Sequence, residues 1–256
     1  LHRLLDAAAG TSLAIGEEVT AFARRAAADA MRERQAADMI AQVRATGGHV
    51  PGVQARLYPY QVDGVAFLVS RGRAILADDM GLGKTLQCIA AATWMKRQGR
   101  VDRTLIVCPA SLKEQWAREI RRFTGATVLV VQGGAPCRAE LYQKDAAFWV
   151  VNYELVLRDV EHISQTLRPD LLILDEAQRI RNWRTKTAEA IKRLETQYAF
   201  VVTGTPLENR LEDLYSLMQA VDHRVLGPLW RYMLDFHVFD DRDRVIGYRN
   251  LGVLRR

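Results

Sequence analysis

The sequence lacks the features of membrane and secreted proteins. No apolar run approaches the roughly 20 residues that a helix needs to span a bilayer, and residues 1–16 do not combine a basic start with an apolar core. Cys88, Cys108 and Cys137 form no Cys-x-x-Cys pair, which argues against a disulfide framework and a zinc site. No repeat or low-complexity tract is visible. We therefore expect no membrane partner, a location in the cytosol or nucleoid (the nucleus in a eukaryote), and reduced, mostly buried cysteines.

The chain is long enough for one large α/β domain with an appendage. Its 256 residues can bury a full core, and a composition of 49% hydrophobic and 26% charged residues is ordinary for a globular protein. The formal net charge is +6; the two signs balance within residues 1–50, so the positive excess lies in residues 51–256. Such an excess attracts polyanions, but many proteins with a similar charge bind none. Charge alone therefore favours a nucleic-acid partner only weakly.

The glycine-rich stretch over residues 73–85 is the segment around which the chain is organised. A short apolar run leads through Gly81 and Gly83 into a segment with helical spacing. Backbone amides around these glycines, with the positive end of the new helix, can surround a polyphosphate. Lys84 supplies a point charge for the outer phosphates, and the Thr85 hydroxyl supplies a ligand for Mg²⁺. The predicted nucleotide contacts in this loop are Asp79, Met80, Gly81, Leu82, Gly83, Lys84, Thr85 and Leu86.

One position departs from the strict P-loop pattern. That pattern places a glycine five residues before Gly83, and Asp78 stands there instead. A strand-to-helix turn that carries Lys-Thr without binding nucleotide would fit the loop alone equally well. The deciding feature is a metal-holding carboxylate after a second buried strand. Asp175 and Glu176, which follow the apolar run over residues 171–174, provide it.

Several short runs are apolar throughout and predict buried strands. They lack the polar alternation of a half-exposed strand, and helical segments separate them. This pattern is typical of a parallel sheet whose two faces are both covered by helices. We therefore predict an α/β fold. Its strands are expected at residues 74–77, 104–109, 127–131, 148–152, 171–174 and 199–203.

Polar residues follow four of the predicted strands directly, where the active residues of a parallel sheet lie. A sheet without such a function can also end in polar turns, but it would rarely combine a P-loop, an Asp-Glu pair and a Thr-Gly-Thr turn. We predict that Asp175 holds Mg²⁺ together with Thr85, and that Glu176 orients or deprotonates the attacking water. The polar turns are residues 109–111, 152–153, 175–176 and 203–206.

Two segments before the P-loop have helical patterns. Residues 17–45 carry apolar side chains at three- and four-residue steps, which predicts an amphipathic helix that we interpret as a connector. Residues 57–68 predict a turn at Pro59 followed by a second helix. In this helix Gln61 can donate and accept at once, which matches the edge of adenine. The alternative is a polar residue at an exposed helix start.

Taken together, these motifs resemble those of the Swi/Snf-type ATPases, DNA translocases of the helicase-like superfamily that are built from two RecA-like lobes. The match runs in the family's order from about residue 55 to 222. It implies a RecA-like fold, ATP and Mg²⁺ as cofactors, and duplex DNA as a partner along which the protein moves without separating the strands. The matching segments are residues 57–61 (adenine recognition), 78–85, 175–182 and 203–209 (helicase motifs one to three), and 108–116 and 152–154 (DNA contact).

The resemblance also implies roles for single residues. Gln178 stands where the family has histidine, and Tyr58 stands where a basic residue is common. The DNA contacts it implies are Ser111, Lys113, Asn152, Tyr153, Arg179, Arg181 and Asn182. The residues it implies for coupling nucleotide state to DNA are Gln178, Thr203, Gly204 and Thr205.

The predicted organisation has three parts: a helical connector (1–50), an ATPase lobe (51–222) and the start of a helical protrusion between lobes (223–256). The family's second lobe, with its arginine finger, has no counterpart in the sequence. We therefore expect a fragment that alone hydrolyses ATP barely above background. Three alternatives stay open: another P-loop enzyme such as a small-molecule kinase or GTPase, a strand-separating or RNA helicase lobe, and a nucleotide-gated DNA-binding module without turnover.

Overall fold

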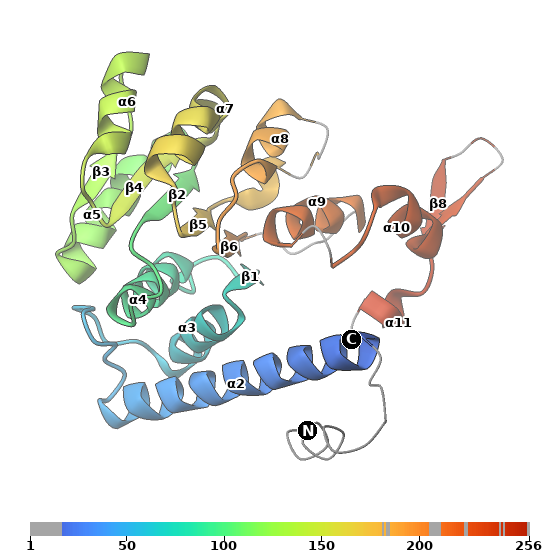
Figure 1. The fold of residues 1–256 in the computed structure, drawn as a ribbon, viewed down its shortest axis with the longest axis horizontal. Coiled ribbons are helices and arrows are strands. Elements are labelled where there is room, and N and C mark those ends of the chain that lie inside the picture. The colour runs from blue at the N-terminus through green and yellow to red at the C-terminus, as the bar shows by residue number, and fades with distance from the viewer. Residues whose placement is uncertain are drawn as a thin grey trace.

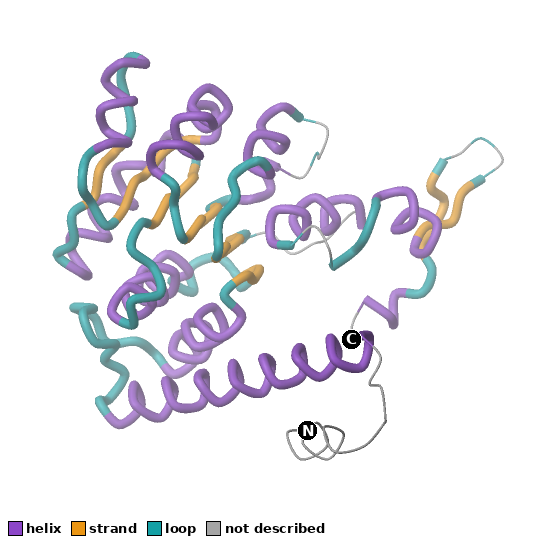
Figure 2. Tube along the Cα trace, viewed as in Figure 1, coloured by secondary structure: helices purple, strands orange, loops and turns teal. Residues whose placement is uncertain are grey.

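The computed structural model describes residues 17–180, 182, 185–204, 211–222, 225–240, 242 and 244–254. Six parallel strands form one sheet in the order β1-β6-β5-β2-β4-β3, between two layers of helices (Figures 1 and 2). Each predicted strand is present within one residue of its expected bounds, which confirms the parallel α/β sheet. The strands are β1 (Arg73–Leu76), β2 (Thr104–Cys108), β3 (Val128–Val130), β4 (Phe148–Asn152), β5 (Leu171–Leu174) and β6 (Tyr198–Val202).

The central strands are buried on both faces because successive side chains enter two different cores. In β5, Leu171 and Ile173 belong to the first core, whereas Leu172 and Leu174 belong to the second. All four are at most 2% exposed. Each such side chain contributes roughly 1.5–3 kcal/mol when it is removed from water. This burial on both faces is why the strand sequences show no polar alternation.

Helices cover the two cores separately. The long helix α2 has the bounds predicted for it, and its second half packs along α3 through Met39 and Val43 in the first core (Figure 1). The helices of the first core are α2 (Glu17–Ala45), α3 (Pro59–Arg71), α4 (Lys84–Arg97) and α5 (Lys113–Thr124), the last preceded by the 3₁₀ turn η1 (Ala110–Leu112). Those of the second core are α6 (Ala135–Gln143), α7 (Tyr153–His162), the π-helical turn η2 (Ile163–Leu167), the 3₁₀ turn η3 (Ala177–Ile180), α8 (Lys186–Lys192) and α9 (Leu211–Val221).

The last segment projects from the sheet on the side away from α6 (Figure 1). It contains the expected helices, α10 (Leu229–Phe236) and α11 (Leu251–Leu254). It also contains an antiparallel hairpin of β7 (His237–Phe239) and β8 (Val245–Tyr248), which the sequence did not lead us to expect. These strands are short, and most of β8 is exposed, so they leave almost no hydrophobic pattern.

Among the helices of the described ranges, none combines the length and the apolarity that crossing a membrane requires.

Candidate functional site

The sheet topology brings the predicted motifs together at the carboxyl ends of the strands. Because all six strands are parallel, their carboxyl ends lie on the same side. The P-loop follows β1, Thr203 follows the neighbouring β6, and Asp175 follows β5, the next strand along. The turns predicted to contact DNA follow β2 and β4, farther along the same edge. The strand order therefore places Thr203 between the phosphate loop and the carboxylates.

The P-loop needs glycine at two positions for geometric reasons. Gly81 and Gly83 have φ angles of 85° and 72°, a left-handed backbone that other residues adopt only at a cost. A side chain at Gly83 would also place its Cβ 2.5 Å from the Gln61 amide nitrogen. Asp78 does not have a positive φ, so the glycine of the strict pattern is not required there. Its absence therefore leaves the loop geometry intact.

Lys84 is the first residue of α4, and its ammonium group lies within its own loop. The Nζ atom donates to the carbonyl oxygens of Asp78 at 2.8 Å and Asp79 at 2.7 Å. A Cβ atom on Gly204, at the end of β6, would lie 3.8 Å from the same Nζ atom. In this structure the ammonium group is therefore held by main-chain carbonyls of its own loop.

Two buried glutamines hold the P-loop from outside. Gln61 accepts a hydrogen bond from the Tyr58 backbone N–H at 3.0 Å, and it donates to the Leu82 carbonyl at 3.2 Å. Gln87, on α4, donates to the same carbonyl at 3.2 Å. Gln87 was not predicted from the sequence; its only signal was a polar residue on the buried face of an Ala-rich helix. Recognition of adenine by Gln61 stays a prediction, and one N–H and one lone pair of its amide remain for that role.

The carboxylate of Asp175 is held at both oxygens. Oδ2 accepts from the Trp116 indole N–H at 2.7 Å, and Oδ1 accepts from the Glu176 backbone N–H at 2.9 Å. Burial raises the pKa of Asp175, against the opposing effect of the Trp116 hydrogen bond. Glu176 has a φ of 51°, which costs about 1 kcal/mol or more for a residue with a Cβ atom. Strained backbone of this kind concentrates at functional sites.

Gln178 joins the end of β5 to the end of β6. Its Nε2 atom donates to the Glu176 carboxylate, and its Oε1 atom accepts from the Thr203 hydroxyl at 3.2 Å. An amide suits this position because it donates and accepts at the same time. Thr205, the other predicted coupling hydroxyl, lies outside the described residues.

The phosphate loop and the two carboxylates line one open cavity of about 580 Å³, within the size range of small-ligand sites. Lys84, Thr85, Asp175 and Glu176 all contribute to its wall. A hydroxyl and a carboxylate are the hard oxygen donors that Mg²⁺ prefers, so Thr85 and Asp175 fit this ion. Trp116, which was not predicted to belong to this site, lines the same cavity.

Most residues predicted to contact DNA also lie at the carboxyl ends of the strands, and several of them already bond to other protein groups. Ser111 and Asn182 are exposed. The Lys113 ammonium donates to the Val131 carbonyl at 3.0 Å. Asn152 and Arg179 both pair with Glu154: Asn152 donates to its carboxylate at 2.6 Å, and Arg179 forms an exposed ion pair with it at 3.5 Å. Arg181 lies outside the described residues.

Tyr153 does not fit its predicted role. Its side chain is 2% exposed, and its hydroxyl donates to the Asp175 carbonyl at 2.7 Å. A ring in the second core cannot reach a DNA strand in this conformation. The correction is that Tyr153 supports the carboxylate strand from within the protein.

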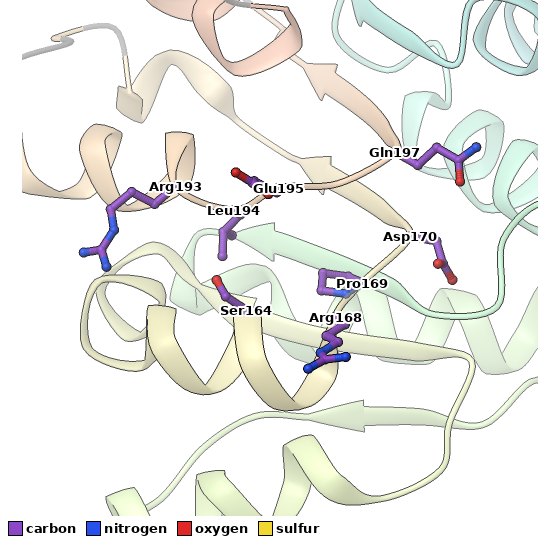
Figure 3. Close-up of a pocket in the computed structure, with 8 residues that line it drawn as sticks. All are labelled: Ser164, Arg168, Pro169, Asp170, Arg193, Leu194, Glu195 and Gln197. Atoms are coloured by element: carbon purple, nitrogen blue, oxygen red, sulfur yellow. The ribbon is translucent and has the colours of Figure 1, made fainter.

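A second cavity, of about 390 Å³, lies at the opposite ends of the strands, where β5 and β6 begin (Figure 3). Arg168 and Arg193 border it, with Asp170 and Glu195. The two guanidinium groups do not converge on one point (Figure 3). Ligands of open parallel sheets bind at the carboxyl ends of the strands, so the first cavity is the candidate site.

Comparison with known proteins gives a consistent result. The family profile described as "SNF2-related domain" matches residues 60–244. The chain is 34% identical over 200 residues to the DNA repair and recombination protein RAD54B of Gallus gallus, a match that covers 71% of this chain and 22% of that protein. It is also 34% identical over 209 residues to the putative ATP-dependent helicase/translocase YwqA of Bacillus subtilis, with 76% and 22% covered.

A solved structure is similar as well. The Sulfolobus solfataricus SWI2/SNF2 ATPase core in complex with dsDNA superposes with a TM-score of 0.67 at 31% sequence identity. The match covers 73% of this chain and 40% of that one. Measured against RAD54B and YwqA, the chain spans about a fifth of the length of its curated relatives, 22% in both cases.

Proposed function

This chain belongs to the SNF2-related family, and we propose that it is the ATP-binding lobe of a DNA-dependent ATPase that moves along duplex DNA and remodels protein–DNA complexes. The observation that carries the proposal is the convergence of Lys84, Thr85, Asp175 and Glu176 on one cavity at the carboxyl edge of a RecA-like sheet. These side chains supply what phosphoryl transfer to water requires: a cradle for the phosphates, metal ligands and a group that positions the water.

Each residue has a distinct part in the proposed reaction. The loop amides and Lys84 bind the phosphates, and Thr85 and Asp175 would hold Mg²⁺, which neutralises phosphate charge when bound. Glu176 orients or deprotonates the attacking water. Gln178 holds the Glu176 carboxylate and bonds to Thr203, which supports a role in relating the water-positioning group to the end of β6.

Duplex DNA is the proposed partner, and it would bind along the turns after β2 and β4 and the segment over residues 179–182. Exposed Arg179 and the exposed Asn182 support this placement, as does the dsDNA bound to the similar Sulfolobus core. Contacts to phosphates would make binding independent of sequence. With a DNA partner, the proposed location is the cytosol or nucleoid, or the nucleus in a eukaryote.

An ATPase titration tests the proposal. Purified protein that contains both RecA-like lobes is mixed with ATP and Mg²⁺, and turnover is measured in the presence of duplex DNA, single-stranded DNA or RNA. We expect duplex DNA to stimulate most, and a Lys84→Ala control to abolish the response. Stimulation by RNA alone would favour an RNA helicase. A strand-displacement assay makes the remaining distinction. Release of one strand of a duplex would favour a strand-separating helicase, whereas release of the third strand of a triplex would support movement along duplex DNA.

The activity of residues 1–256 by themselves needs a separate test. An arginine finger contributes roughly 10³–10⁵ in rate in related reactions, and the family carries it on a second RecA-like lobe. We propose that residues 1–256 alone bind ATP weakly and turn it over barely above background, and that a second lobe in cis restores DNA-stimulated turnover. Robust DNA-stimulated hydrolysis by this chain as a monomer would contradict the proposal.

A further inference from the structure

Asp175 is held by one side chain from each face of the sheet. Trp116, on α5 in the first core, donates its indole N–H to the Asp175 Oδ2 atom at 2.7 Å. Tyr153, on α7 in the second core, donates its hydroxyl to the Asp175 carbonyl oxygen at 2.7 Å. The two anchors are 1% and 2% exposed. One therefore fixes the carboxylate and the other fixes the main chain that carries it.

The geometry of this carboxylate matters because Mg²⁺ demands nearly ideal octahedral positions from its ligands. The other oxygen, Oδ1, accepts from the backbone N–H of the adjacent Glu176, and that contact turns with the residue itself. Trp116 is thus the contact that ties the carboxylate to another element of the fold. An indole N–H donates and cannot accept, so it orients the oxygen without competing for the metal.

We propose that Trp116 and Tyr153 are positioning residues of the metal site, which set the direction of the Asp175 carboxylate toward a bound ion. This inference rests on the proposed function, because it assigns the ion to Asp175. Trp116 lies in the first turn of α5 and Tyr153 begins α7. Both helices follow the strand-end turns at which DNA is proposed to bind. The two anchors therefore join the DNA-facing turns to the metal ligand through single hydrogen bonds.

The test measures metal affinity in place of turnover. Residues 1–256 are saturated with a non-hydrolysable ATP analogue, and Mn²⁺ is titrated in as a spectroscopic substitute for Mg²⁺ while electron paramagnetic resonance reports the free ion. Outer-shell partners of metal ligands are worth about 10–100-fold in affinity, so Trp116→Phe should weaken Mn²⁺ binding about tenfold. Tyr153→Phe should weaken it in the same direction. Binding of the analogue in EDTA should stay unchanged in both variants.

The chain offers matched controls. Trp149 is 2% exposed and donates its indole N–H to the Leu141 carbonyl at 2.9 Å. Tyr142 is 2% exposed and donates its hydroxyl to Asp159 at 3.1 Å. Trp149→Phe and Tyr142→Phe remove the same groups from equally buried positions that do not line the nucleotide cavity. Neither should change Mn²⁺ affinity, even if each lowers the melting temperature.

The outcomes separate this inference from the proposed function. If the wild-type chain binds no Mn²⁺ with the analogue, the proposed metal site itself is wrong. If wild type binds Mn²⁺ and Trp116→Phe binds it equally well, the positioning role is wrong. If Trp116→Phe does not fold, the indole N–H resonances of ¹⁵N-labelled wild type give the answer. The Trp116 signal should shift when Mg²⁺ joins the analogue complex while that of Trp149 stays, and a Trp116 signal that does not shift overturns the proposal.

Discussion

Gln61 and Gln87 donate their side-chain amides to the same acceptor, the carbonyl oxygen of Leu82, each at 3.2 Å. They come from α3 and α4, so the P-loop is held by two helices at its midpoint. The Oε1 atom of Gln87 is buried and has no hydrogen-bond partner within the described residues. The unpaired Oε1 atom lowers stability, whereas the Nε2 atom of the same amide supports the loop.

Replacing Gln87 with Met should separate nucleotide binding from stability. The loss of one hydrogen bond, about 1 kcal/mol, predicts an affinity for an ATP analogue about fivefold weaker. The melting temperature should not fall, because the substitution also removes the unpaired oxygen. Fluorescence titration and thermal unfolding measure the two effects. Gln197→Met, an exposed glutamine at the far edge of the sheet, should change neither. Unchanged affinity in Gln87→Met would show that the loop does not depend on this bond.

Lys84 and Glu176 should affect different steps, because one binds phosphate and the other positions water. Lys84→Ala should weaken nucleotide binding by an order of magnitude or more, since a charge-assisted phosphate contact is worth about 1.5–3 kcal/mol. Glu176→Gln should bind nucleotide normally and lose turnover in a DNA-stimulated assay. Equilibrium binding and phosphate release measure the two steps. Nucleotide affinity that is unchanged in Lys84→Ala would refute the assignment of the loop.

The segment after the carboxylates should supply non-specific DNA affinity. We expect Arg179→Ala combined with Arg181→Ala to weaken duplex binding equally across sequences and to reduce the slope of log affinity against log salt by about 2. The matched control is Arg168→Ala with Arg193→Ala, which removes the same charge at the opposite edge (Figure 3). Equal effects of the two double variants would mean that only net charge matters.

The buried pair of Arg138 and Asp159 should matter for stability alone. Their side chains are 7% and 5% exposed and form two hydrogen bonds of 2.6 and 2.7 Å, which raise the pKa of Arg138. Arg138→Met leaves a buried carboxylate without its cation, so we expect a loss of about 3–5 kcal/mol in the free energy of unfolding. Adding Asp159→Leu should recover much of that loss. Urea unfolding measures it, and a double variant as unstable as the single one would contradict the explanation.

The three cysteines should differ in reactivity. Burial raises the pKa of Cys88 strongly and that of Cys108 to about 12, whereas Cys137 is exposed. Only the thiolate reacts with disulfide reagents, so at pH 8 the two buried thiols are protonated as well as inaccessible. Ellman's reagent should therefore label one thiol quickly in the folded chain and all three in denaturant. Rapid labelling of two or three would show that α4, which carries Cys88, or the end of β2, which carries Cys108, opens readily.

The sheet and the phosphate loop could be predicted from the sequence because their signals are local. A strand buried on both faces must be apolar throughout, as residues 171–174 are, and a loop that needs positive φ angles must contain glycines such as Gly81 and Gly83. The exposed hairpin of β7 and β8 has no such requirement, so its sequence carried no comparable pattern.

The contacts around Asp175 could not be predicted because they join elements far apart in the chain. Trp116 and Tyr153 carry polar groups whose common partner, Asp175, is fixed by how helices pack on the sheet, and no spacing in the sequence encodes that. The family resemblance implied a DNA contact for Tyr153, which follows a strand end, but its position as the first residue of α7 turns the ring into the second core. Strand ends predict where a site lies and do not predict which way each side chain points.

The strand that carries the P-loop, β1, lies at the edge of the sheet, where β6 is its one partner in the described part of the chain, in the register Arg73 with Ala199. During synthesis on the ribosome, β1 therefore emerges long before its partner exists. Domains fold as their chains are completed, and pairing across so long a stretch of chain is slow. A nascent chain should thus be unable to bind nucleotide until β6 has left the exit tunnel. Translation that stalls before that point would yield a phosphate loop with no sheet to support it.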